Sequence, residues 1–590
     1  MLTETQFKIL YTVIQKQDYK FTQRVLARET GYSLGKINEA VKGLTEAGLL
    51  NNDMQISSIG YEAMESYKVK NAVIMAAGMS SRFVPLSYEK PKALLKVKGE
   101  VLIEREIKQL QEAGLTDITV VVGYLKEQLF YLGDKYNVNI VINDDYYRYN
   151  NTSTLIRVAD RLDNTYICSS DNYFTENPFE PYVYRAYYAA VYEAAKTDEY
   201  CISFNNKGRI TKVNIGGQSS WYMLGHVYFD RDFSRKFVRI LRNEYDDPLT
   251  KQQLWEDLYI RHIKELDLYI RKYDADKIKE FDSLEELRGF DDKYLKNANS
   301  KIFTNICTAL DVKEENITNV IPIKKGLTNF SFRFTVNGRE YVYRHPGVGT
   351  SNFINRTSEK TSLEIAKKLG LDDTFICMDE KEGWKISYYI DDAETLDYHD
   401  QEQVKEAIRM VRKLHTCNLK TNFTFDIWEE IRKFEERLEE RGNNQFEDMQ
   451  ELHNIMENLR SFIIREDNEK CLCHCDTYDP NFLVDVSGKI YLIDWEYSGM
   501  AYRGGDIGTF IACSDYTREE ADRIINMYLE HEADTKEKRY YYTYIAAAAY
   551  YWFLWAIYQN SVGNDVGEYL YIWYKYTKTY SREAKKYFEK

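Results

Sequence analysis

The 590-residue sequence contains few of the residues that mark non-globular chains. Eight prolines and 29 glycines are too few for a collagen-like or linker-rich protein, and 44% apolar residues can form packed cores. The longest apolar run, at residues 544–558, has about 15 residues, whereas a bilayer-spanning helix needs about 20. The N-terminus also lacks the basic and then apolar order of a signal peptide. The sequence therefore predicts a protein with no membrane span that is not exported.

Positive charge and disulfide-forming cysteines are also scarce. Lys and Arg total 79 against 93 Asp and Glu, and the net charge of −14 argues against a general nucleic-acid coat. The nine cysteines are an odd number, and three of them crowd at Cys471, Cys473 and Cys475, too close for a disulfide framework. We therefore expect a reducing, cytoplasmic location. Tyrosine, at 51 residues, is in excess, and an aromatic-rich acidic protein suits organic cations.

The length predicts several folding units, and the sequence pattern changes twice along the chain. From residue 71, apolar runs alternate with helical segments, which predicts a parallel sheet with ligand sites at the carboxyl ends of its strands. The polar segment 287–300 is the predicted linker, and a strand-rich lobe followed by helical segments comes after it. We expect three domains, at residues 1–68, 69–290 and 298–590.

Residues 1–68 resemble a winged helix-turn-helix of the kind that bacterial regulators use. Two interpretations remain open for this module. In the first, a helix face that bears Lys36, Asn38 and Lys42 contacts DNA; in the second, the module docks to a protein or dimerises. Residues 1–70 contain nine Lys and Arg against eight Asp and Glu, so the basic footprint of a DNA-binding domain is missing.

A small-residue turn follows the first apolar run, AVIMAAG. Such a turn lets backbone N–H groups at Ala77 and Gly78 approach a triphosphate, while Arg82 and Lys92 neutralise the phosphate oxygens. Asp171 comes directly after the apolar run YICSS, where a strand end would present its carboxylate to Mg²⁺. This constellation favours chemistry on a nucleoside triphosphate.

The pattern resembles the A-A-G-x-G-x-R…P-K signature of nucleotidyltransferases. The stretches VVGYLKEQL and RYNNTSTL are similar to bacterial CTP:phosphocholine cytidylyltransferases, and Ser80 stands where the family usually has glycine. The resemblance implies attack of a phosphomonoester oxygen on the α-phosphorus of CTP, without a covalent enzyme intermediate. It also implies that Asp282 is a second metal ligand, although capping of the following helix explains this residue equally well.

A choline head group needs an aromatic wall and a counter-charge. Trp255 and Glu256 in QLWEDLY are the candidates for these two roles, and the family resemblance adds Tyr200 as a further wall. The alternative places Trp255 in the core and Glu256 on a solvated face.

The most specific motif is His474-Cys475-Asp476, followed by Asn481 and then by Asp494. Phosphoryl transfer to a hydroxyl needs a carboxylate that orients the hydroxyl and oxygen ligands that hold Mg²⁺ on the nucleotide. The H-x-D-x₄-N spacing puts Asp476 and Asn481 at the two ends of one tight loop. It resembles the catalytic loop of kinases, with Asp494 in the position of the metal-binding Asp.

The continuation DWEYSG through RGGDI resembles choline and ethanolamine kinases. The resemblance implies a phosphate-covering turn at Gly326, Thr328 and Asn329. It also implies that Arg344 occupies the strand position where protein kinases have Lys, and that Glu359 pairs with it from the next helix.

Trp552 and Trp555 lie three residues apart and hence on one face of a predicted helix. A quaternary ammonium has no N–H to donate, so ring faces bind it best. Such stripes usually belong to a core, but choline kinases carry a Trp pair at the matching point, which implies a choline cage here. Glu496 and Asp506 are the counter-charge candidates, and Asp506 has the alternative role of bracing the catalytic loop.

The cluster Cys471, Cys473, His474 and Cys475 also suggests zinc. We do not expect a zinc site, because side chains on an extended chain alternate faces and zinc ligand pairs usually need wider spacing and a second pair elsewhere.

Together these motifs predict a multidomain α/β protein: a winged helix-turn-helix, a Rossmann-like nucleotidyltransferase sheet, and a bilobal protein-kinase-like α+β domain. The expected protein is a bifunctional choline kinase and CTP:phosphocholine cytidylyltransferase that makes CDP-choline from choline, ATP and CTP with Mg²⁺. The resemblance further implies a role in phosphocholine decoration of cell-surface glycans. The same chemistry on ethanolamine, a DNA-binding regulator that senses choline metabolites, and a homo-oligomer remain open.

Overall fold

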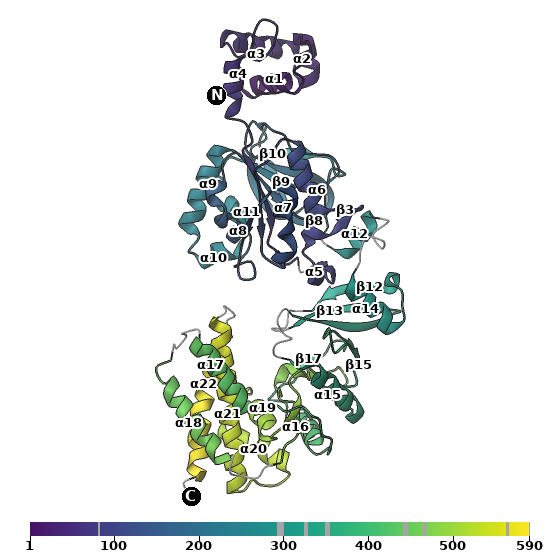
Figure 1. Ribbon diagram of the computed structural model, residues 1–590, viewed down its shortest axis with the longest axis vertical. Coiled ribbons are helices and arrows are strands. Elements are labelled where there is room, and N and C mark those ends of the chain that lie inside the picture. The colour runs from purple at the N-terminus through teal and green to yellow at the C-terminus, as the bar shows by residue number, and fades with distance from the viewer. Residues whose placement is uncertain are drawn as a thin grey trace. The chain divides into compact units, whose positions relative to one another are not determined.

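The computed structural model describes residues 1–80, 83–281, 283–291, 300–323, 329–347, 354–440, 446–463, 469–561 and 566–588. The chain divides into two compact units, Met1–Thr304 and Asn305–Lys590 (Figure 1). None of the described helices combines the length and apolar character that a bilayer crossing requires.

The first unit begins with four helices around a small apolar core. Each helix starts at a hydroxyl side chain, Thr3, Thr22, Ser33 or Ser57, that accepts a hydrogen bond from the first turn. The helices are α1 (Glu4–Gln15), α2 (Gln23–Thr30), α3 (Leu34–Glu46) and α4 (Ser58–Glu65). A single antiparallel bridge joins Leu50 and Ile56, where the wing is expected. The winged-helix assignment itself stays a prediction.

Helix α1 packs against the segment that leads into the neighbouring sheet. The Phe7 ring lies 5.5 Å from the Tyr184 ring, and the Tyr11 ring lies 6.0 Å from the Tyr182 ring. Tyr184 also donates a hydrogen bond to the carbonyl of Leu2. The α3 residues Lys36, Asn38 and Lys42 remain exposed. The helical module is thus held to the sheet through α1, while the face that was expected to contact DNA is not part of this contact.

A seven-stranded sheet forms the centre of the first unit, in the order β10-β8-β9-β6-β1-β4-β5. Strands β1 (Asn71–Ala76), β4 (Ile118–Val122), β5 (Asn139–Ile142) and β6 (Thr165–Ser169) run parallel. The long strand β9 (Ile210–Phe229) is antiparallel to β6 and to β8 (Tyr187–Phe204), and β10 (Tyr269–Tyr273) lies parallel to β8. The sheet is therefore mixed, which corrects the expectation of a wholly parallel one.

Helices cover both faces of this sheet (Figure 1), so its central strands are apolar on both sides. The helices of this domain are α5 (Leu86–Glu89), α6 (Leu102–Glu112), α7 (Tyr131–Tyr136), α8 (Thr152–Arg157), α9 (Arg231–Glu244), α10 (Pro248–Gln252), α11 (Trp255–Arg261) and α12 (Leu284–Phe290), and not all of them lie on the sheet. Two small sheets accompany them: β2 (Lys96–Val97) with β3 (Glu100–Val101), and β7 (Asn172–Phe174) with β11 (Ile278–Glu280).

The second unit begins with an antiparallel five-stranded sheet, ordered β12-β13-β14-β16-β15. Helix α14 (Lys301–Leu310) precedes the sheet, and α15 (Arg356–Leu369) follows its third strand. The strands are β12 (Ile317–Pro322), β13 (Asn329–Val336), β14 (Arg339–Pro346), β15 (Phe375–Met378) and β16 (Lys385–Tyr388).

A helical region with short strands follows. Its helices are α16 (Gln401–His415), α17 (Ile427–Glu440), α18 (Met449–Ile463), α19 (Gly504–Ala512), α20 (Arg518–Leu529), α21 (Thr535–Ser561) and α22 (Tyr569–Phe588). Its strands are β17 (Glu394–Thr395), β18 (Cys471–Cys473), β19 (Phe482–Val484), β20 (Ile490–Leu492) and β21 (Gly499–Ala501). The unit thus has a sheet-rich part and a helix-rich part.

Helix α21 contains the longest apolar run of the sequence and lies in the core of the helical region. A helix that is apolar all round is typical of such a buried position. Helix α19 approaches it closely through two glycines: a Cβ on Gly504 would collide with the Tyr544 ring, and one on Gly508 would lie 2.5 Å from the Tyr544 carbonyl oxygen. Only glycine permits this spacing between the two helices.

Candidate active sites

A pocket of about 570 Å³ lies at the carboxyl ends of β1 and β6. Open α/β sheets commonly bind ligands at such an edge. The predicted residues Ala77, Gly78, Lys92 and Asp171 all line it, and Ser80, at the family's usual glycine position, has a φ of 47°. Sequence analysis missed other lining side chains, which include Asn143, Tyr146, Tyr149, Asn150, Asn151, Thr154 and Ser169.

Lys92 and Asp171 form an ion pair in this pocket. The Lys92 Nζ lies 2.9 Å from the Asp171 Oδ2, and the lysine side chain is only 8% exposed. The second carboxylate oxygen of Asp171 is buried and has no hydrogen-bond partner among the described residues. A carboxylate oxygen left free beside a phosphate-sized pocket fits a divalent cation.

The structure corrects the expectation that Trp255 forms an aromatic wall. Its side chain is 1% exposed and stacks on the Tyr188 ring at 5.7 Å, with Phe229 against its edge. Trp255 therefore belongs to the core, because large apolar rings gain most free energy when both faces are covered.

Glu256 is buried rather than on a solvated face. Its carboxylate accepts hydrogen bonds from the Tyr188 hydroxyl at 3.0 Å and from Asn151 Nδ2 at 3.4 Å. Burial raises the pKa of Glu256 to about 7. Because Asn151 lines the pocket, Glu256 lies one residue behind the pocket wall. Tyr200 donates to the Asp257 carboxylate at 2.9 Å, and its predicted contact with a ligand stays a prediction.

The second unit contains the loop predicted from the H-x-D-x₄-N motif. Asn481 Nδ2 donates to the backbone oxygen of Asp476 at 2.8 Å and to its Oδ2 at 2.9 Å, which closes the loop. The Asp476 Oδ1 is buried without a hydrogen-bond partner among the described residues. Burial, followed by the negative charge of Asp494, raises the pKa of Asp476. The two aspartates are thus close enough to repel each other, as expected where a cation or a substrate hydroxyl binds between acidic groups.

Arg344 and Glu359 pair as predicted by the resemblance, with 2.5 Å between the Arg344 Nη1 and the Glu359 Oε1. Arg344 also lies 3.5 Å from the carboxylate of Asp494. Burial opposes ionisation of Glu359, but the charge of Arg344 prevails and the pKa of Glu359 falls to about 2. The pair therefore places a buried positive charge beside the predicted metal ligand.

Arg344, Glu359 and Asp494 form a charge cluster, and two further cations that sequence analysis missed belong to it. The Arg356 Nη1 donates to the Glu359 Oε2 at 2.8 Å, and the Lys385 Nζ lies 3.8 Å from the Glu359 Oε1. Arg356 precedes Glu359 by one helical turn, which is the signal that could have identified it.

Glu496 lies next to residues of the five-stranded sheet and of helix α15. Asn329 Nδ2 donates to the Glu496 Oε2 at 2.9 Å, and Arg356 lies 3.6 Å from the same atom. Glu496 thus contacts Asn329 and Arg356 of the sheet-rich part, and its predicted role as a counter-charge for the substrate cation stays a prediction.

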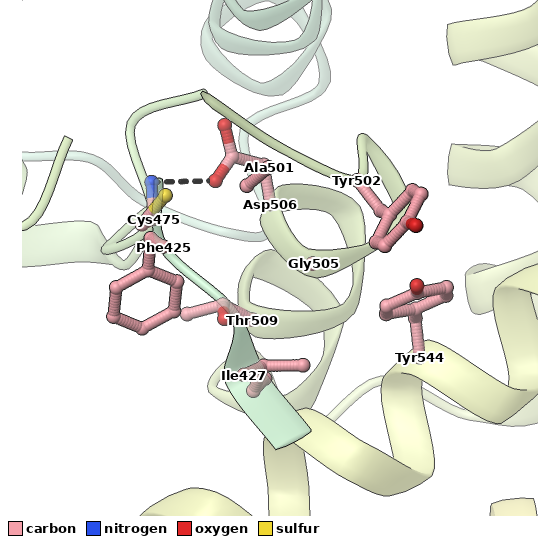
Figure 2. A pocket seen from close by; sticks show the side chains of 9 residues that line it. All are labelled: Phe425, Ile427, Cys475, Ala501, Tyr502, Gly505, Asp506, Thr509 and Tyr544. Carbon is pink, nitrogen blue, oxygen red and sulfur yellow. Dashed lines mark hydrogen bonds between the residues drawn. The ribbon is translucent and has the colours of Figure 1, made fainter. Parts of the chain in front are cut away.

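Asp506 braces the catalytic loop, as one of the two interpretations proposed. Its carboxylate accepts hydrogen bonds from the backbone N–H groups of His474 at 2.8 Å and Cys475 at 2.7 Å. Figure 2 shows the second of these bonds beside a cavity of about 20 Å³ that Phe425 and Tyr544 also line. A fully buried carboxylate that is occupied in this way is not available to a substrate cation.

Aromatic rings gather next to the catalytic loop. The Trp552 and Trp555 rings lie 5.5 Å apart at 79°, and the Tyr478 ring, two residues after Asp476, lies 5.9 Å from Trp552. Sequence analysis missed Trp573, which stacks on Trp552 at 5.7 Å, and Tyr569, which stacks on Trp573 at 5.4 Å. The predicted Trp pair is thus part of a larger cluster that includes helix α22.

Comparisons with known proteins agree with these two sites. Residues 72–237 match the MobA-like NTP transferase domain model, and residues 320–572 match the choline/ethanolamine kinase model. The choline-phosphate cytidylyltransferase of Streptococcus pneumoniae is 34% identical over 228 residues, which cover 39% of this chain and 99% of that protein. The chain belongs to the nucleotidyltransferase family and carries a choline/ethanolamine kinase domain.

Two other relatives show the range of this resemblance. The 2-aminoethylphosphonate cytidylyltransferase of Lancefieldella rimae is 35% identical over 229 residues, which cover 38% of this chain and 93% of that protein. Protein LicA of Haemophilus influenzae is 24% identical over 258 residues, which cover 41% of this chain and 94% of that protein. The predicted fold class, a Rossmann-like sheet followed by a choline-kinase-like domain, is therefore confirmed.

Four predicted site residues of the nucleotidyltransferase and kinase domains lie outside the described residues: Arg82, Asp282, Gly326 and Thr328. Their proposed roles stay predictions. Both families use a divalent metal, and the described carboxylates that fit one are Asp171 in the first domain and Asp494 in the second; Asn481, the other predicted ligand, is hydrogen-bonded to Asp476.

Proposed function

We propose that this chain phosphorylates choline with ATP and then transfers a cytidylyl group from CTP to the phosphocholine, which yields CDP-choline and pyrophosphate. One observation carries the proposal: each unit contains a separate site for phosphate chemistry, and the product of one reaction is the substrate of the other. The loop of Asp476 and Asn481 forms one site, and the pocket of Lys92 and Asp171 forms the other.

In the kinase reaction, Asp476 orients the choline hydroxyl toward the γ-phosphorus of ATP and accepts its proton. The free Oδ1 of Asp476 is the atom available for this hydrogen bond. Choline would bind with its trimethylammonium group against the Trp552, Trp555 and Trp573 cluster, because ring faces attract a cation that cannot donate hydrogen bonds. Arg344, fixed by Glu359, would hold the ATP phosphates.

In the cytidylyl transfer, a phosphocholine oxygen attacks the α-phosphorus of CTP and pyrophosphate leaves. The backbone at Ala77 and Gly78 lies open to the triphosphate, and Lys92 neutralises the negative charge that develops. Mg²⁺ is the proposed metal of both reactions, and when bound it would neutralise phosphate oxygens and align the attacking and leaving groups.

The nine cysteines are all unpaired, which supports the predicted cytoplasmic location.

The test is to incubate the purified chain with choline, ATP, CTP and Mg²⁺ and to follow the products by phosphorus NMR. We expect phosphocholine to appear first and CDP-choline with pyrophosphate to follow. Omission of CTP should stop the reaction at phosphocholine. If CDP-choline never forms from added phosphocholine and CTP, the proposal fails.

A second candidate substrate is 2-aminoethylphosphonate. The cytidylyltransferase half is as similar to a 2-aminoethylphosphonate cytidylyltransferase as to a choline-phosphate cytidylyltransferase. The kinase family also includes ethanolamine as a substrate. A primary ammonium demands hydrogen-bond acceptors, whereas the described cage residues present ring faces, and this difference favours choline. Parallel assays with choline, ethanolamine and 2-aminoethylphosphonate decide, and a Trp573→Leu variant should weaken choline binding but not ATP binding.

The N-terminal module has no assigned role in this chemistry. Its contacts with Tyr182 and Tyr184 run through α1 and leave Lys36, Asn38 and Lys42 exposed, so protein docking and DNA binding both stay open for this module. A gel shift with genomic fragments would reveal the regulator alternative if the chain bound DNA specifically and turned over neither substrate. We also propose that the CDP-choline supplies phosphocholine for cell-surface glycans, and deletion of the gene should then remove phosphocholine from these glycans. We propose in addition a homo-oligomer, and sedimentation of the purified protein tests its size.

A further inference from the structure

A cluster of soft ligand groups lies beside the catalytic loop and takes no part in the proposed chemistry. Cys471 and Cys473 alternate with Leu472 on β18, so their side chains share one face, and their Sγ atoms lie 3.7 Å apart. His415, at the end of helix α16, contributes a ring nitrogen, and these three ligand atoms lie within 4.8 Å of one another. His415 and Cys473 are buried and Cys471 is partly buried.

The separation of the two sulfur atoms suits a tetrahedral metal. Two Zn–S bonds of about 2.3 Å at a tetrahedral angle place the sulfurs about 3.8 Å apart. The observed 3.7 Å needs almost no movement of the β18 backbone.

The second ring nitrogen of His415 has the partner that metal-binding histidines typically have. The His415 Nε2 lies 2.9 Å from the Asp506 Oδ2. Metal-ligating histidines usually donate this other N–H to a carboxylate, which fixes the ring and makes the ligating nitrogen more basic. The Nδ1 atom is left for the metal, and its present partner is the hydroxyl of Tyr528 at 2.8 Å.

We propose that His415 Nδ1, Cys471 Sγ and Cys473 Sγ form a zinc site, with the Tyr528 hydroxyl or a water as the fourth ligand. This proposal revises the sequence-based expectation for the cysteine cluster. Side chains that alternate along β18 bring Cys471 and Cys473 together, and the third ligand comes from a helix that no local spacing could reveal.

The other two members of the sequence cluster do not belong to the site. The His474 Nε2 donates to the Ile493 carbonyl at 2.9 Å, and Cys475 lines the small cavity with Phe425 and Tyr544 (Figure 2). The zinc site would nevertheless reach the kinase chemistry, because Asp506 contacts both His415 and the backbone of the catalytic loop.

The test uses the reduced, chelator-treated full-length chain, with Mg²⁺ and ATP present to occupy the hard-metal sites. Titration with Co²⁺ should give one equivalent per chain with thiolate-to-metal charge-transfer absorption and intense visible bands of a tetrahedral complex, and Zn²⁺ should displace it. Cys471→Ser and Cys473→Ser should each weaken Zn²⁺ binding ten-fold or more and reduce the charge-transfer band. The control Cys377→Ser, in a cysteine on β15, should change neither quantity.

Cys473 is fully buried, so its variant could unfold for unrelated reasons. Zinc X-ray absorption on the unmodified protein avoids this problem and should show two sulfur and one imidazole ligand. Only oxygen and nitrogen ligands, absence of a charge-transfer band, or full retention of the band in the double cysteine variant would overturn the proposal. The cytidylyl-transfer and kinase assays are independent of all these readouts, so failure here leaves the proposed function intact.

Discussion

Two buried glutamates, one in each unit, differ in what surrounds them. Glu359 meets Arg344, Arg356 and Lys385 among the described residues, and the pKa of Glu359 falls to about 2. The Glu256 carboxylate accepts hydrogen bonds from the neutral side chains of Tyr188 and Asn151, and burial raises the pKa of Glu256 to about 7. The same side chain is therefore a permanent anion in the kinase unit and close to half-protonated at neutral pH in the nucleotidyltransferase unit. Burial alone does not set the charge state; the neighbouring cations do.

The two active sites also differ in the number of cations and carboxylates that contact one another. In the kinase site, Arg344 contacts Glu359 and Asp494, whereas the described part of the cytidylyl site has the single Lys92–Asp171 pair. Loss of one charge from the Arg344 and Glu359 cluster should therefore lower the stability of the kinase unit. Loss of the Lys92 charge should mainly lower the activity of the nucleotidyltransferase unit.

The largest expected effect separates the two chemistries. Asp476→Ala removes the carboxylate that orients the hydroxyl, and kinase activity should fall by roughly 10³- to 10⁴-fold. Cytidylyl transfer to added phosphocholine should remain within two-fold of the unmodified rate. Asp485→Ala, at a half-buried residue in the turn between β19 and β20, is the control and should leave both rates unchanged. Loss of both activities in a folded Asp476→Ala protein would contradict independent sites.

Glu359→Gln tests the buried charge cluster. Removal of one partner from a buried pair costs about 3–5 kcal/mol, because the remaining charges are left uncompensated. We expect that loss in the urea-unfolding free energy of the kinase unit, with little change in the nucleotidyltransferase unit. The exposed pair of Glu406 and Arg409 gives the comparison, since Glu406→Gln should cost less than about 1 kcal/mol. Equal costs for the two variants would remove the distinction drawn between the units.

Lys92→Ala tests the simpler site. The single described cation of the pocket is lost, and cytidylyl transfer should fall by roughly 10²- to 10³-fold, the range for one charge-stabilising group. Kinase activity should be unaffected. Lys126→Ala, at a surface lysine of the same domain that pairs with Asp144, should leave cytidylyl transfer intact. A normal rate in the Lys92→Ala protein would show that this pocket is not the active site.

The smallest effect is a pH dependence of stability. The folded pKa of Glu256 is raised to about 7 from an ordinary value of 4.5, so its folded form retains a proton that the unfolded chain loses. The associated stability is complete below pH 4.5 and is lost as the pH rises through 7, by at most about 3 kcal/mol. Glu256→Gln should flatten the decline in urea-unfolding free energy of the nucleotidyltransferase unit between these pH values. Glu359 has the opposite sign, since its lowered pKa gives stability above pH 4.5 that is lost as the pH falls through 2. An unchanged slope in Glu256→Gln would exclude this carboxyl as the source.

The sequence predicted the elements that depend on local spacing. The Asp476–Asn481 loop, the turn at Ala77 and Gly78, and the position of Asp171 are each encoded within a few neighbouring residues. Arg356, Lys385 and Trp573 could not be found in this way, because they reach their sites from elements far along the chain. The predicted wall at Trp255 was wrong for a related reason: a motif identifies a residue but not the direction in which its side chain points.

Helix α19 contains Gly504 and Gly508, whose lack of side chains allows the close approach to α21, and the same helix contains Asp506. The distance between α19 and α21 therefore sets the position of the Asp506 carboxylate, which accepts hydrogen bonds from the backbone of the catalytic loop. A methyl group at Gly508, which is not one of the predicted site residues, would push α19 away from α21, shift Asp506 relative to the backbone of the catalytic loop and slow phosphoryl transfer.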